Sequence, residues 1–466
     1  MTVHASPTPA RSRALDRATD GRPAPPVRIV HLGVGNFFRA HQAWYTEHAP
    51  DASGWGIAAF TGRSPGAAVG LERQAGLYTL LVLGADRAEA EVVSSLSAVH
   101  AADDLDALRR YLASDEVAVV TSTVTEAGYR RDDAGGLDAG ADDVRADIAA
   151  LAADPAGGRV TTTPGRLVAG LLARRAAAVG PLALVPCDNL PDNGAALRRV
   201  VTDLARLVDP GLVAWIDEHV SFVTTTVDRI TPRPTDADRA EVARLTGVDD
   251  PQAVVTEPFA EWVLAGDFPA GRPAWDVAGA RFVEDVRPFE TRKLWLLNGG
   301  HSVLAYAGSI RGHLTVAEAI ADPLVRDWVE EWWEAAGRHL TLPAVEVAAY
   351  RQALLDRFAN PRIRHLLAQI AADGSQKVPI RAVPVLLAER AAGRLPLGAT
   401  RFVAAWIAHL RGHGAPVTDV RAAEIRTLAD GPADAAAAEV LTWLGVDDLE
   451  VTAMVEQQLR ELEQGN

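Results

Sequence analysis

A short apolar run that ends in two glycines constrains the fold of this 466-residue chain more than any other feature. The run is VRIVHL at residues 27–32, and its β-branched, apolar character predicts a buried strand. Gly33 and Gly35 follow it and allow a tight turn before a helix-like stretch. Strand, Gly-x-Gly turn and helix together begin a dinucleotide-binding fingerprint, in which backbone N–H groups approach a pyrophosphate. A merely structural turn is the alternative.

Two parts of the usual fingerprint are missing. Phe38 occupies the place of the third glycine. After a second apolar run, GIAAF at 56–60, the chain continues TGRS at 61–64, so no carboxylate is available there for a ribose 2′-hydroxyl. Arg63 could hold a 2′-phosphate instead, or it could be an incidental residue of a solvated loop. The loop therefore leaves NADP open as an alternative to NAD, the expected cofactor.

Short apolar runs alternate with helix-like stretches through the first 285 residues. The strand-like runs continue at 117–124 and 182–186, the helix-like stretches lie at 104–113 and 165–178, and further strands are expected at 221–232 and around 282–283. This alternation predicts a parallel sheet wrapped by helices.

Long Ala/Leu-rich segments with helical periodicity dominate after about Pro288. They lie at 292–307, 315–337, 343–356, 362–372, 382–392 and 400–411. The predicted fold class is α/β: a Rossmann-type N-terminal domain with a mostly α-helical C-terminal domain. We expect a flexible tail at 1–26, the Rossmann-type dinucleotide-binding domain at 27–285, and a helical substrate and catalytic domain at 286–466.

Composition excludes several classes of protein. A net charge of −15 argues against nucleic-acid binding. The single cysteine, Cys187, excludes an intrachain disulfide and a cysteine-rich zinc or iron–sulfur site. No apolar run approaches the roughly 20 residues of a membrane span. The first 26 residues are polar and Pro-rich without an apolar signal segment, which favours a cytoplasmic protein.

Lysine is almost absent: of 46 basic residues only Lys293 and Lys377 are lysines. A surface lysine can become arginine with little penalty, but a position that needs an amine able to lose its proton cannot, since guanidinium stays protonated. The two lysines are therefore candidates for chemistry.

Lys293 lies in a helix-like stretch together with Glu290, Asn298 and His301. At about 100° per residue, these four side chains span an arc of roughly 140° on one helix. Apolar neighbours predict that they are buried, and a desolvated amine is a usable general base. Asparagine can donate to a developing oxyanion, and histidine can orient a hydroxyl. A helix whose polar edge happens to include these residues is the alternative.

The spacing K-x4-N-x2-H at Lys293, Asn298 and His301 resembles the pattern of the polyol-specific long-chain dehydrogenases, a family that includes mannitol 2-dehydrogenase and fructuronate reductase. HLGVGNFFRAHQAWY at 31–45 is similar to the family's cofactor turn, GxGxFxRAH, in which a third glycine is not expected. Further similar segments are TVTEAGY at 123–129, VPCDNLPDNG at 185–194, VDRITP at 227–232, EPFAEWV at 257–263 and DGSQKVPIR at 373–381.

The resemblance implies a role for each matching residue and no metal. Lys293 would be the general base that removes a proton from the C2 hydroxyl as hydride passes to the nicotinamide. Asn189 and Asn298 would form an oxyanion hole, His301 would position the same oxygen, and Glu290 would pass the proton to solvent.

The resemblance also implies substrate and cofactor contacts. Asp228, Lys377 and Arg381 would bind the substrate; the alternative for Lys377 is a structural tether to backbone carbonyls. The cofactor-binding residues would be Gly33, Gly35, Asn36, Phe37 and Arg39, with Arg63 added from the loop after the second strand.

The predicted function is a metal-independent oxidoreductase that transfers a hydride between NAD(P) and C2 of a polyol or ketose, of the mannitol–fructose type. A fructuronate or tagaturonate reductase and a sugar-phosphate dehydrogenase are alternatives within the family. A catalytically silent dinucleotide-binding regulatory protein is the alternative of another class. The expected partner is a small sugar or polyol, with no nucleic acid and no membrane, and the family implies a monomer.

Overall fold

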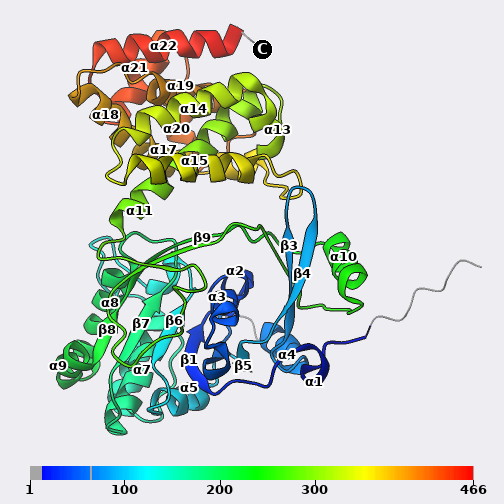
Figure 1. The fold of residues 1–466 in the computed structure, drawn as a ribbon. Helices are drawn as coiled ribbons and strands as arrows, with labels where there is room; N and C mark the ends of the chain where they lie inside the picture. Colours follow the sequence, from blue (N-terminus) through cyan, green and yellow to red (C-terminus); the bar gives the residue numbers. More distant parts are fainter. Residues whose placement is uncertain (1–12, 63–65, 465–466) are drawn as a thin grey trace, which may run out of the picture. The chain divides into compact units, whose positions relative to one another are not determined.

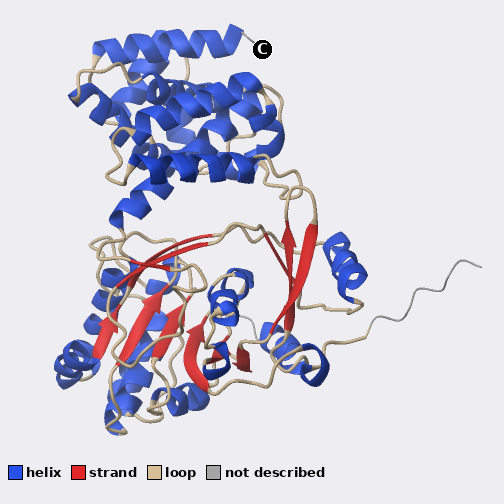
Figure 2. Ribbon diagram, in the orientation of Figure 1, coloured by secondary structure: helices blue, strands red, loops and turns tan. Residues whose placement is uncertain are grey.

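The computed structural model describes residues 13–62 and 66–464 and consists of two compact units, Met1–Val286 and Arg287–Asn466. Figure 2 shows that the first unit mixes helices and strands, whereas the described part of the second is helical. The predicted class, a Rossmann-type α/β domain followed by a mostly helical domain, is confirmed.

Six parallel strands form the main sheet of the first unit, in the order β5-β2-β1-β6-β7-β8 (Figure 1). Their bounds are β1 (Val27–Leu32), β2 (Gly56–Phe60), β5 (Leu96–His100), β6 (Val119–Ser122), β7 (Leu182–Pro186) and β8 (Val220–Phe222). All neighbouring strands pair in parallel, as the alternating pattern predicts. The chain continues from β1 to one side of the sheet and returns to the other side at β6, so the strand order reverses between them.

Successive residues of the strands enter separate cores on the two faces of this sheet. Val30 and Leu32 of β1 pack with residues of helices α5, α7 and α8, whereas Ile29 packs with residues of α2 and α3. Because both faces are covered, the strands are mostly apolar on both faces, as parallel strands in α/β proteins usually are. The helices of the unit are α1 (Arg17–Asp20), α2 (Asn36–Ala40), α3 (Gln42–His48), α4 (Gly66–Arg73), α5 (Leu105–Leu112), α6 (Asp142–Ala153), α7 (Thr163–Ala176), α8 (Asn193–Val208), α9 (Pro210–His219) and α10 (Asp236–Thr246), with short 3₁₀ turns η1 (Ala52–Gly54) and η2 (Glu126–Tyr129).

Two three-stranded sheets complete the first unit. One has the order β10-β3-β4, with β3 (Tyr78–Leu83), β4 (Ala88–Val93) and β10 (Val254–Thr256), and the other has the order β12-β11-β9, with β9 (Thr224–Asp228), β11 (Glu261–Ala265) and β12 (Arg281–Phe282). The strands expected within 221–232 and around 282–283 are therefore present as β8, β9 and β12.

Helix α19 is the centre of the second unit. It is buried along almost its whole length, and α14 and α22 pack against it. The helices are α11 (Arg287–Arg292), α12 (Gly299–Val303), α13 (Val316–Ala321), α14 (Pro323–Gly337), α15 (Ala344–Phe358), α16 (Leu367–Ala371), α17 (Gly374–Arg381), α18 (Val383–Ala391), α19 (Leu397–Leu410), α20 (Ala422–Leu428), α21 (Ala433–Trp443) and α22 (Leu449–Gln464), with π-helical turns η3 (Lys293–Asn298) and η4 (Leu304–Gly308). None of the helices in the described ranges combines the length and the apolar character needed to cross a bilayer.

Two predicted helices of the second unit differ from the structure. The stretch 315–337 is interrupted, because Asp322 caps a new helix that begins at Pro323. The stretch 362–372 is helical only in α16. Its first residues bond to the segment before α13 instead, since the amide of Val316 donates to the carbonyl of His365 at 3.0 Å. The backbone groups that a longer helix would need are thus already engaged.

The structure also differs from the predicted flexible tail at residues 13–26. Leu15 is buried beside Leu77 and Val248. The guanidinium of Arg17 donates to the carbonyls of Ala75, Ser94 and Leu96. These residues therefore pack on the first unit, and the rest of the predicted tail lies outside the described residues.

Candidate active site

The two glycines after β1 differ in the reason for which they are glycine. Gly33 has a φ of +105°, and a Cβ built there would lie 2.1 Å from the carbonyl oxygen of Thr123. Gly35 has a φ of −129°, which any residue can adopt. The nearest atom to a Cβ at Gly35 is the carbonyl oxygen of Gly33, at 3.7 Å. Gly33 is required by the fold, whereas nothing among the described residues requires Gly35.

This turn lies at the carboxyl edge of the parallel sheet, where the strand order reverses between β1 and β6. Ligands of open α/β sheets bind at such switch points. No contact among the described residues requires a glycine at position 35, and a glycine there leaves room for a group that approaches the backbone closely. The turn therefore fits a dinucleotide pyrophosphate, the group that the sequence predicts.

Phe38, which stands in place of the third glycine, stacks on His31 at the end of β1. Their ring centroids are 3.5 Å apart with an angle of 8° between the planes. The His31 nitrogens lie 2.8 and 3.1 Å from the hydroxyls of Thr121 and Thr123. Burial lowers the pKa of His31 to about 3, so the ring is neutral. In the usual fingerprint the third glycine lets the helix approach the strand closely. Here the stacked rings of Phe38 and His31 fill the space between helix and strand instead.

Arg39 and Asn36 stabilise the turn itself. The Arg39 guanidinium donates to the carbonyl of Gly35 at 3.3 Å, to the side-chain oxygen of Asn36 at 2.8 Å, and to the carbonyl of Gln252. Burial lowers the pKa of Arg39. All three guanidinium nitrogens of Arg39 therefore bond to the first unit itself. This structural role differs from the cofactor contact that the sequence predicts for Arg39. Phe37 is half-buried, and Arg63 lies outside the described residues.

Asn189 follows β7 and is exposed, next to a buried anchor that the sequence analysis missed. The carboxylate of Asp188 accepts from the amides of Val124 and Thr125 at 2.8 and 2.7 Å and from the Tyr129 hydroxyl at 3.0 Å. Burial raises the pKa of Asp188 above the ordinary value of a carboxyl group. Asp188 therefore joins the loops after β6 and β7 and fixes the backbone that carries Asn189.

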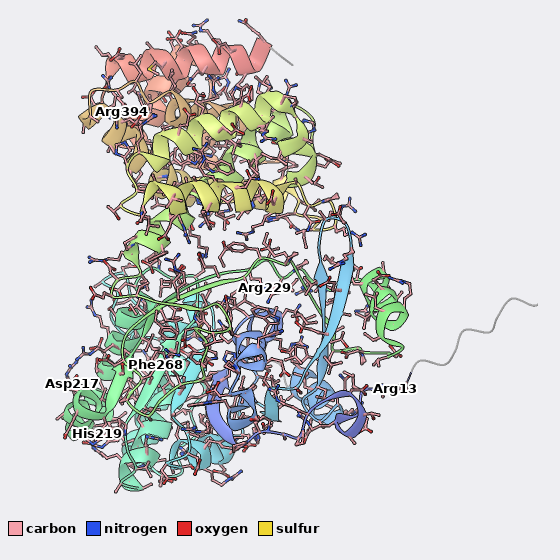
Figure 3. The ribbon with its side chains drawn as sticks, viewed as in Figure 1. Arg13, Asp217, His219, Arg229, Phe268 and Arg394 are labelled. Atoms are coloured by element: carbon pink, nitrogen blue, oxygen red, sulfur yellow. The ribbon has the colours of Figure 1, made fainter. Side chains whose placement is uncertain are left out.

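Asp228 ends β9 and is buried, opposite Glu261 in the register with β11. The next residue, Arg229, is labelled in Figure 3. It is another buried residue that was not predicted from the sequence. Its guanidinium donates to the carbonyls of Ala40 and Glu257 and lies 4.6 Å from the Trp44 ring centroid. Arg229 thus connects the end of β9 to the end of α2, and burial lowers its pKa to about 10.

The helix that carries Lys293, Asn298 and His301 is not a regular α-helix, so the prediction of 100° per residue is wrong here. The order is α11, the π-turn η3, α12 and the π-turn η4. In η3 the amide of Gly299 donates to the carbonyl of Leu294, five residues earlier. In a π-turn the backbone hydrogen bonds join residues five apart, so two such residues stand at the two ends of one hydrogen-bonded turn. Lys293 and Asn298 are five apart, so η3 brings them toward a common face that a regular α-helix would not give them.

His301 is buried, whereas Glu290, Lys293 and Asn298 are half-buried, so the predicted burial holds fully for one of the four. Burial, followed by the charges of His365, Arg357 and Arg381, lowers the pKa of His301 well below its ordinary value. Within the described residues its Nε2 has no hydrogen-bond partner.

The His301 ring lies 4.7 Å from Phe358 and edge-on to His365 at 5.0 Å. A neutral imidazole with one buried nitrogen unused can bind a hydroxyl of a ligand. His365 was missed, because its position in a loop after Asn-Pro gave no signal of this contact.

Lys377 and Arg381 lie on α17 and bond to backbone carbonyls. The Lys377 ammonium donates to the carbonyl of Ile370 at 3.1 Å and to that of Ala372, and burial lowers its pKa. This is the tether that the sequence left open as an alternative. Arg381 donates to the carbonyl of Asn298 at 3.0 Å and to the Ser302 hydroxyl at 2.8 Å, and burial lowers its pKa to about 10. Arg381 therefore holds the helix that carries the candidate site.

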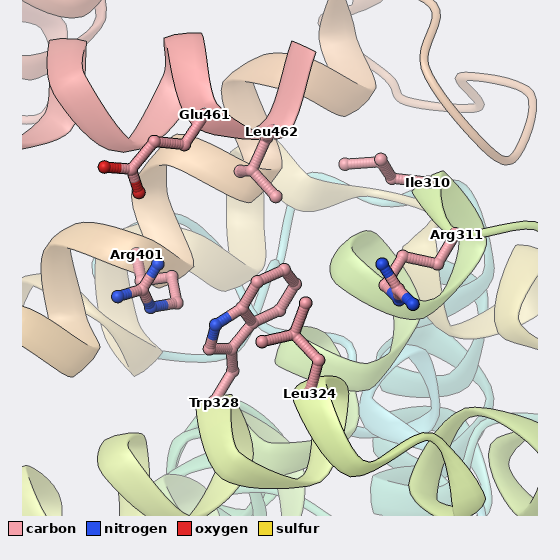
Figure 4. A pocket seen from close by; sticks show the side chains of 7 residues that line it. All are labelled: Ile310, Arg311, Leu324, Trp328, Arg401, Glu461 and Leu462. Carbon is pink, nitrogen blue, oxygen red and sulfur yellow. The ribbon is translucent and has the colours of Figure 1, made fainter. Parts of the chain in front are cut away.

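A separate hollow of about 390 Å³ in the second unit contains none of the predicted site residues (Figure 4). It is lined by Ile310, Arg311, Leu324, Trp328, Arg401, Glu461 and Leu462. Its arginines are already paired, Arg311 with Asp322 at 2.6 Å and Arg401 with Glu331 at 2.8 Å. Within residues 13–62 and 66–464, no group of three or more His, Cys, Asp or Glu side chains could hold a metal ion.

The strand order and the glycine turn define the first unit as a Rossmann-type domain, and comparisons with known proteins place the whole chain. The family described as mannitol dehydrogenase Rossmann domain matches residues 27–277, and mannitol dehydrogenase C-terminal domain matches residues 285–463. The chain therefore belongs to the mannitol dehydrogenase family.

Named relatives in this family act on polyols and sugar acids. The chain is 38% identical to D-mannonate oxidoreductase of Escherichia coli (strain K12), over 83% of this chain and 80% of that protein. It is 35% identical to mannitol 2-dehydrogenase of Cereibacter sphaeroides, over 86% and 84%. The structure of Pseudomonas fluorescens mannitol 2-dehydrogenase in a ternary complex with NAD and D-mannitol aligns with a TM-score of 0.76 at 34% identity, covering 98% of this chain and 95% of that one.

The contrast between the glycines predicts that alanine substitutions at Gly33 and Gly35 change the stability by very different amounts. Gly33→Ala should lower the free energy of unfolding by at least about 2 kcal/mol, because it combines a positive φ with a clash against Thr123. Gly35→Ala should change it by less than about 0.5 kcal/mol. Urea unfolding followed by circular dichroism measures both variants, and equal losses would contradict the assignment of Gly35 to an external group.

Proposed function

We propose that this chain is an NAD-dependent oxidoreductase that interconverts a secondary alcohol of a straight-chain polyol or sugar acid and the corresponding ketone. The observation that carries the proposal is the π-turn that brings Lys293 and Asn298 toward one face, one helical turn before the buried, neutral His301. The family to which the chain belongs supports the same reaction class.

The first unit would hold the cofactor at the glycine turn. Gly35 leaves the backbone of the turn open to a pyrophosphate, Gly33 allows the tight turn itself, and the N–H groups around Asn36 and Phe37 would face the pyrophosphate. When bound, NAD supplies the hydride acceptor in oxidation and NADH the hydride donor in reduction. The bound NAD of the Pseudomonas fluorescens enzyme supports this choice. NADP stays an alternative that depends on Arg63.

Lys293 would act as the general base. In the oxidation direction its neutral amine takes the proton of the substrate hydroxyl, while the hydrogen on the same carbon leaves as hydride and the C–O bond becomes C=O. In reduction the ammonium returns that proton to the oxygen. Glu290, three residues earlier and half-buried, would exchange the proton with solvent.

Asn298 and Asn189 would stabilise the charge that develops on the reacting oxygen. An amide N–H can donate to an oxyanion without carrying a charge that favours either direction of the reaction. His301 would contribute its unused Nε2 to the same oxygen, and its neutrality prevents it from competing with Lys293 for the proton. Asp228 would bind another hydroxyl of the substrate.

The substrate is proposed to be uncharged, of the mannitol–fructose type. A carboxylate at the far end of a sugar acid would favour a cation with unused donors. The Lys377 ammonium, predicted there, already bonds to the carbonyls of Ile370 and Ala372. Arg381 bonds to the carbonyl of Asn298 and to the Ser302 hydroxyl, and its Nε, which has no partner within the described residues, is buried. They are therefore better suited to shaping the site than to neutralising a substrate carboxylate.

A substrate panel tests the function. Oxidation of NADH and NADPH is measured with fructose, fructuronate, tagaturonate and fructose 6-phosphate, and the highest kcat/KM is expected with NADH and fructose. A preference for fructuronate or tagaturonate would contradict the uncharged substrate. Dinucleotide binding without turnover on any of the four would favour a catalytically silent protein.

Lys293→Arg should abolish most of the activity, because guanidinium keeps the charge but cannot act as a base at neutral pH. General acid–base catalysis contributes about 10²–10⁴-fold, so kcat should fall by about that factor. Lys377→Arg makes the same exchange at the other lysine and should cost less than about tenfold, because a tether needs a donor rather than a base. Equal losses in the two variants, measured as kcat for fructose reduction, would contradict the role of Lys293.

Gly35→Ala should weaken cofactor binding without unfolding the protein. A Cβ there points into space that no described residue fills, so it would meet the pyrophosphate. We expect the Kd for NADH to rise at least about tenfold, which corresponds to about 1.4 kcal/mol. Fluorescence titration with NADH measures it, with Gly54→Ala as control, since a Cβ at Gly54 meets nothing within 4 Å. An unchanged Kd would place the dinucleotide elsewhere.

A further inference from the structure

A pair of adjacent tryptophans on α14 contacts the backbone of the π-turn η3. Trp332 and Trp333 are both fully buried. The indole N–H of Trp332 donates to the carbonyl of Trp295 at 2.8 Å, and that of Trp333 donates to the carbonyl of Leu296 at 2.8 Å. Both accepting residues lie between Lys293 and Asn298 in the chain. The pair therefore bonds directly to the turn that carries the candidate catalytic residues.

The bond from Trp332 satisfies the carbonyl that the π-turn leaves without its usual partner. In an α-helix the amide of Gly299 would donate to the carbonyl of Trp295, four residues earlier. Here that amide donates to the carbonyls of Leu294 and Leu296 instead. A carbonyl that loses its helical donor in a partly buried segment needs another donor, and the indole N–H of Trp332 supplies it. The N–H of Trp332 thus favours the π-turn over the α-helical alternative.

Two glycines make room for the tryptophans. A Cβ at Gly299 would lie 2.6 Å from the indole nitrogen of Trp332, and a Cβ at Gly300 would lie 3.0 Å from that of Trp333. The Gly-Gly pair between Asn298 and His301 is therefore matched to the Trp-Trp pair. The Trp333 ring also lies 6.0 Å from Phe358, which itself contacts His301.

We propose that Trp332 and Trp333 are positioning residues that maintain η3 as a π-turn and thereby align Lys293 with Asn298. The inference rests on the proposed function of these two residues. If η3 became α-helical, Lys293 and Asn298 would be five α-helical steps apart, about 140° around the axis. By maintaining the π-turn, the two tryptophans contribute to catalysis through the backbone, without touching the substrate.

The test replaces each tryptophan by phenylalanine, which removes the N–H and keeps an aromatic ring. Trp332→Phe and Trp333→Phe are each expected to lower kcat at least about tenfold while the Kd for NADH changes less than about twofold. The matched control is Trp443→Phe, which removes an indole bond to Glu424 of 3.0 Å in the same unit and should leave kcat unchanged. Where a phenylalanine variant does not fold, benzothienylalanine at the same position keeps the indole shape without the N–H.

A second measurement separates alignment from general destabilisation. In an Asn298→Ala background, adding Trp332→Phe should lower kcat less than about twofold, since the alignment it protects is already lost. A full additional loss, or an unchanged kcat in the single variants, would overturn the inference. A wild-type protein without turnover on the substrate panel would contradict the proposed function instead.

Discussion

The hydrogen bond from the amide of Gly299 to the carbonyl of Leu294 determines the geometry of the candidate site. It replaces an α-helical bond by one that spans five residues, and it belongs to the π-turn η3, whose first and last residues are Lys293 and Asn298. The carbonyls around it accept from Trp332, Trp333 and Arg381. A local departure from the α-helix is thus held by side chains from α14 and α17, and a π-turn of this kind is frequent at functional sites.

In the glycine turn of the first unit, contacts within the protein explain some residues, whereas others are left open to a ligand. Gly33 is a glycine because the backbone of Thr123, the residue after β6, lies too close for a side chain, whereas Gly35 has open space beside it. Around them, the functions of neighbouring residues are structural: Phe38 stacks on His31, and Arg39 joins the turn to Gln252. The fold uses its larger side chains to fix the turn and leaves the backbone itself for the ligand.

The sequence predicted the regular parts of this architecture well. The runs 27–32, 56–60 and 182–186 are strands of the parallel sheet, because an apolar, β-branched run between helices has few other outcomes. Strand β4, AEAEVV, was missed because its alternating charges indicate no buried run. The π-turns could not be predicted, since a helical wheel assumes one constant period.

The candidate site was only partly accessible to the same reasoning. Scarcity of lysine singled out Lys293 and Lys377 equally, and only the structure shows that Lys377 bonds to carbonyls. Asp188, Arg229 and His365 are buried polar residues whose partners are far away in the sequence, so no local pattern indicates them. The roles of Lys293, Asn298, Asn189 and Glu290 stay predictions until they are measured.

The two lysines permit one direct measurement of the central claim. Protein labelled with ¹³C at lysine gives two side-chain signals, which Lys293→Arg assigns. We expect the Lys293 signal to titrate with the same midpoint as the pH–rate profile for polyol oxidation, and the Lys377 signal to titrate with a different one. A Lys293 signal whose titration is unrelated to the rate would contradict the role of Lys293 as the general base.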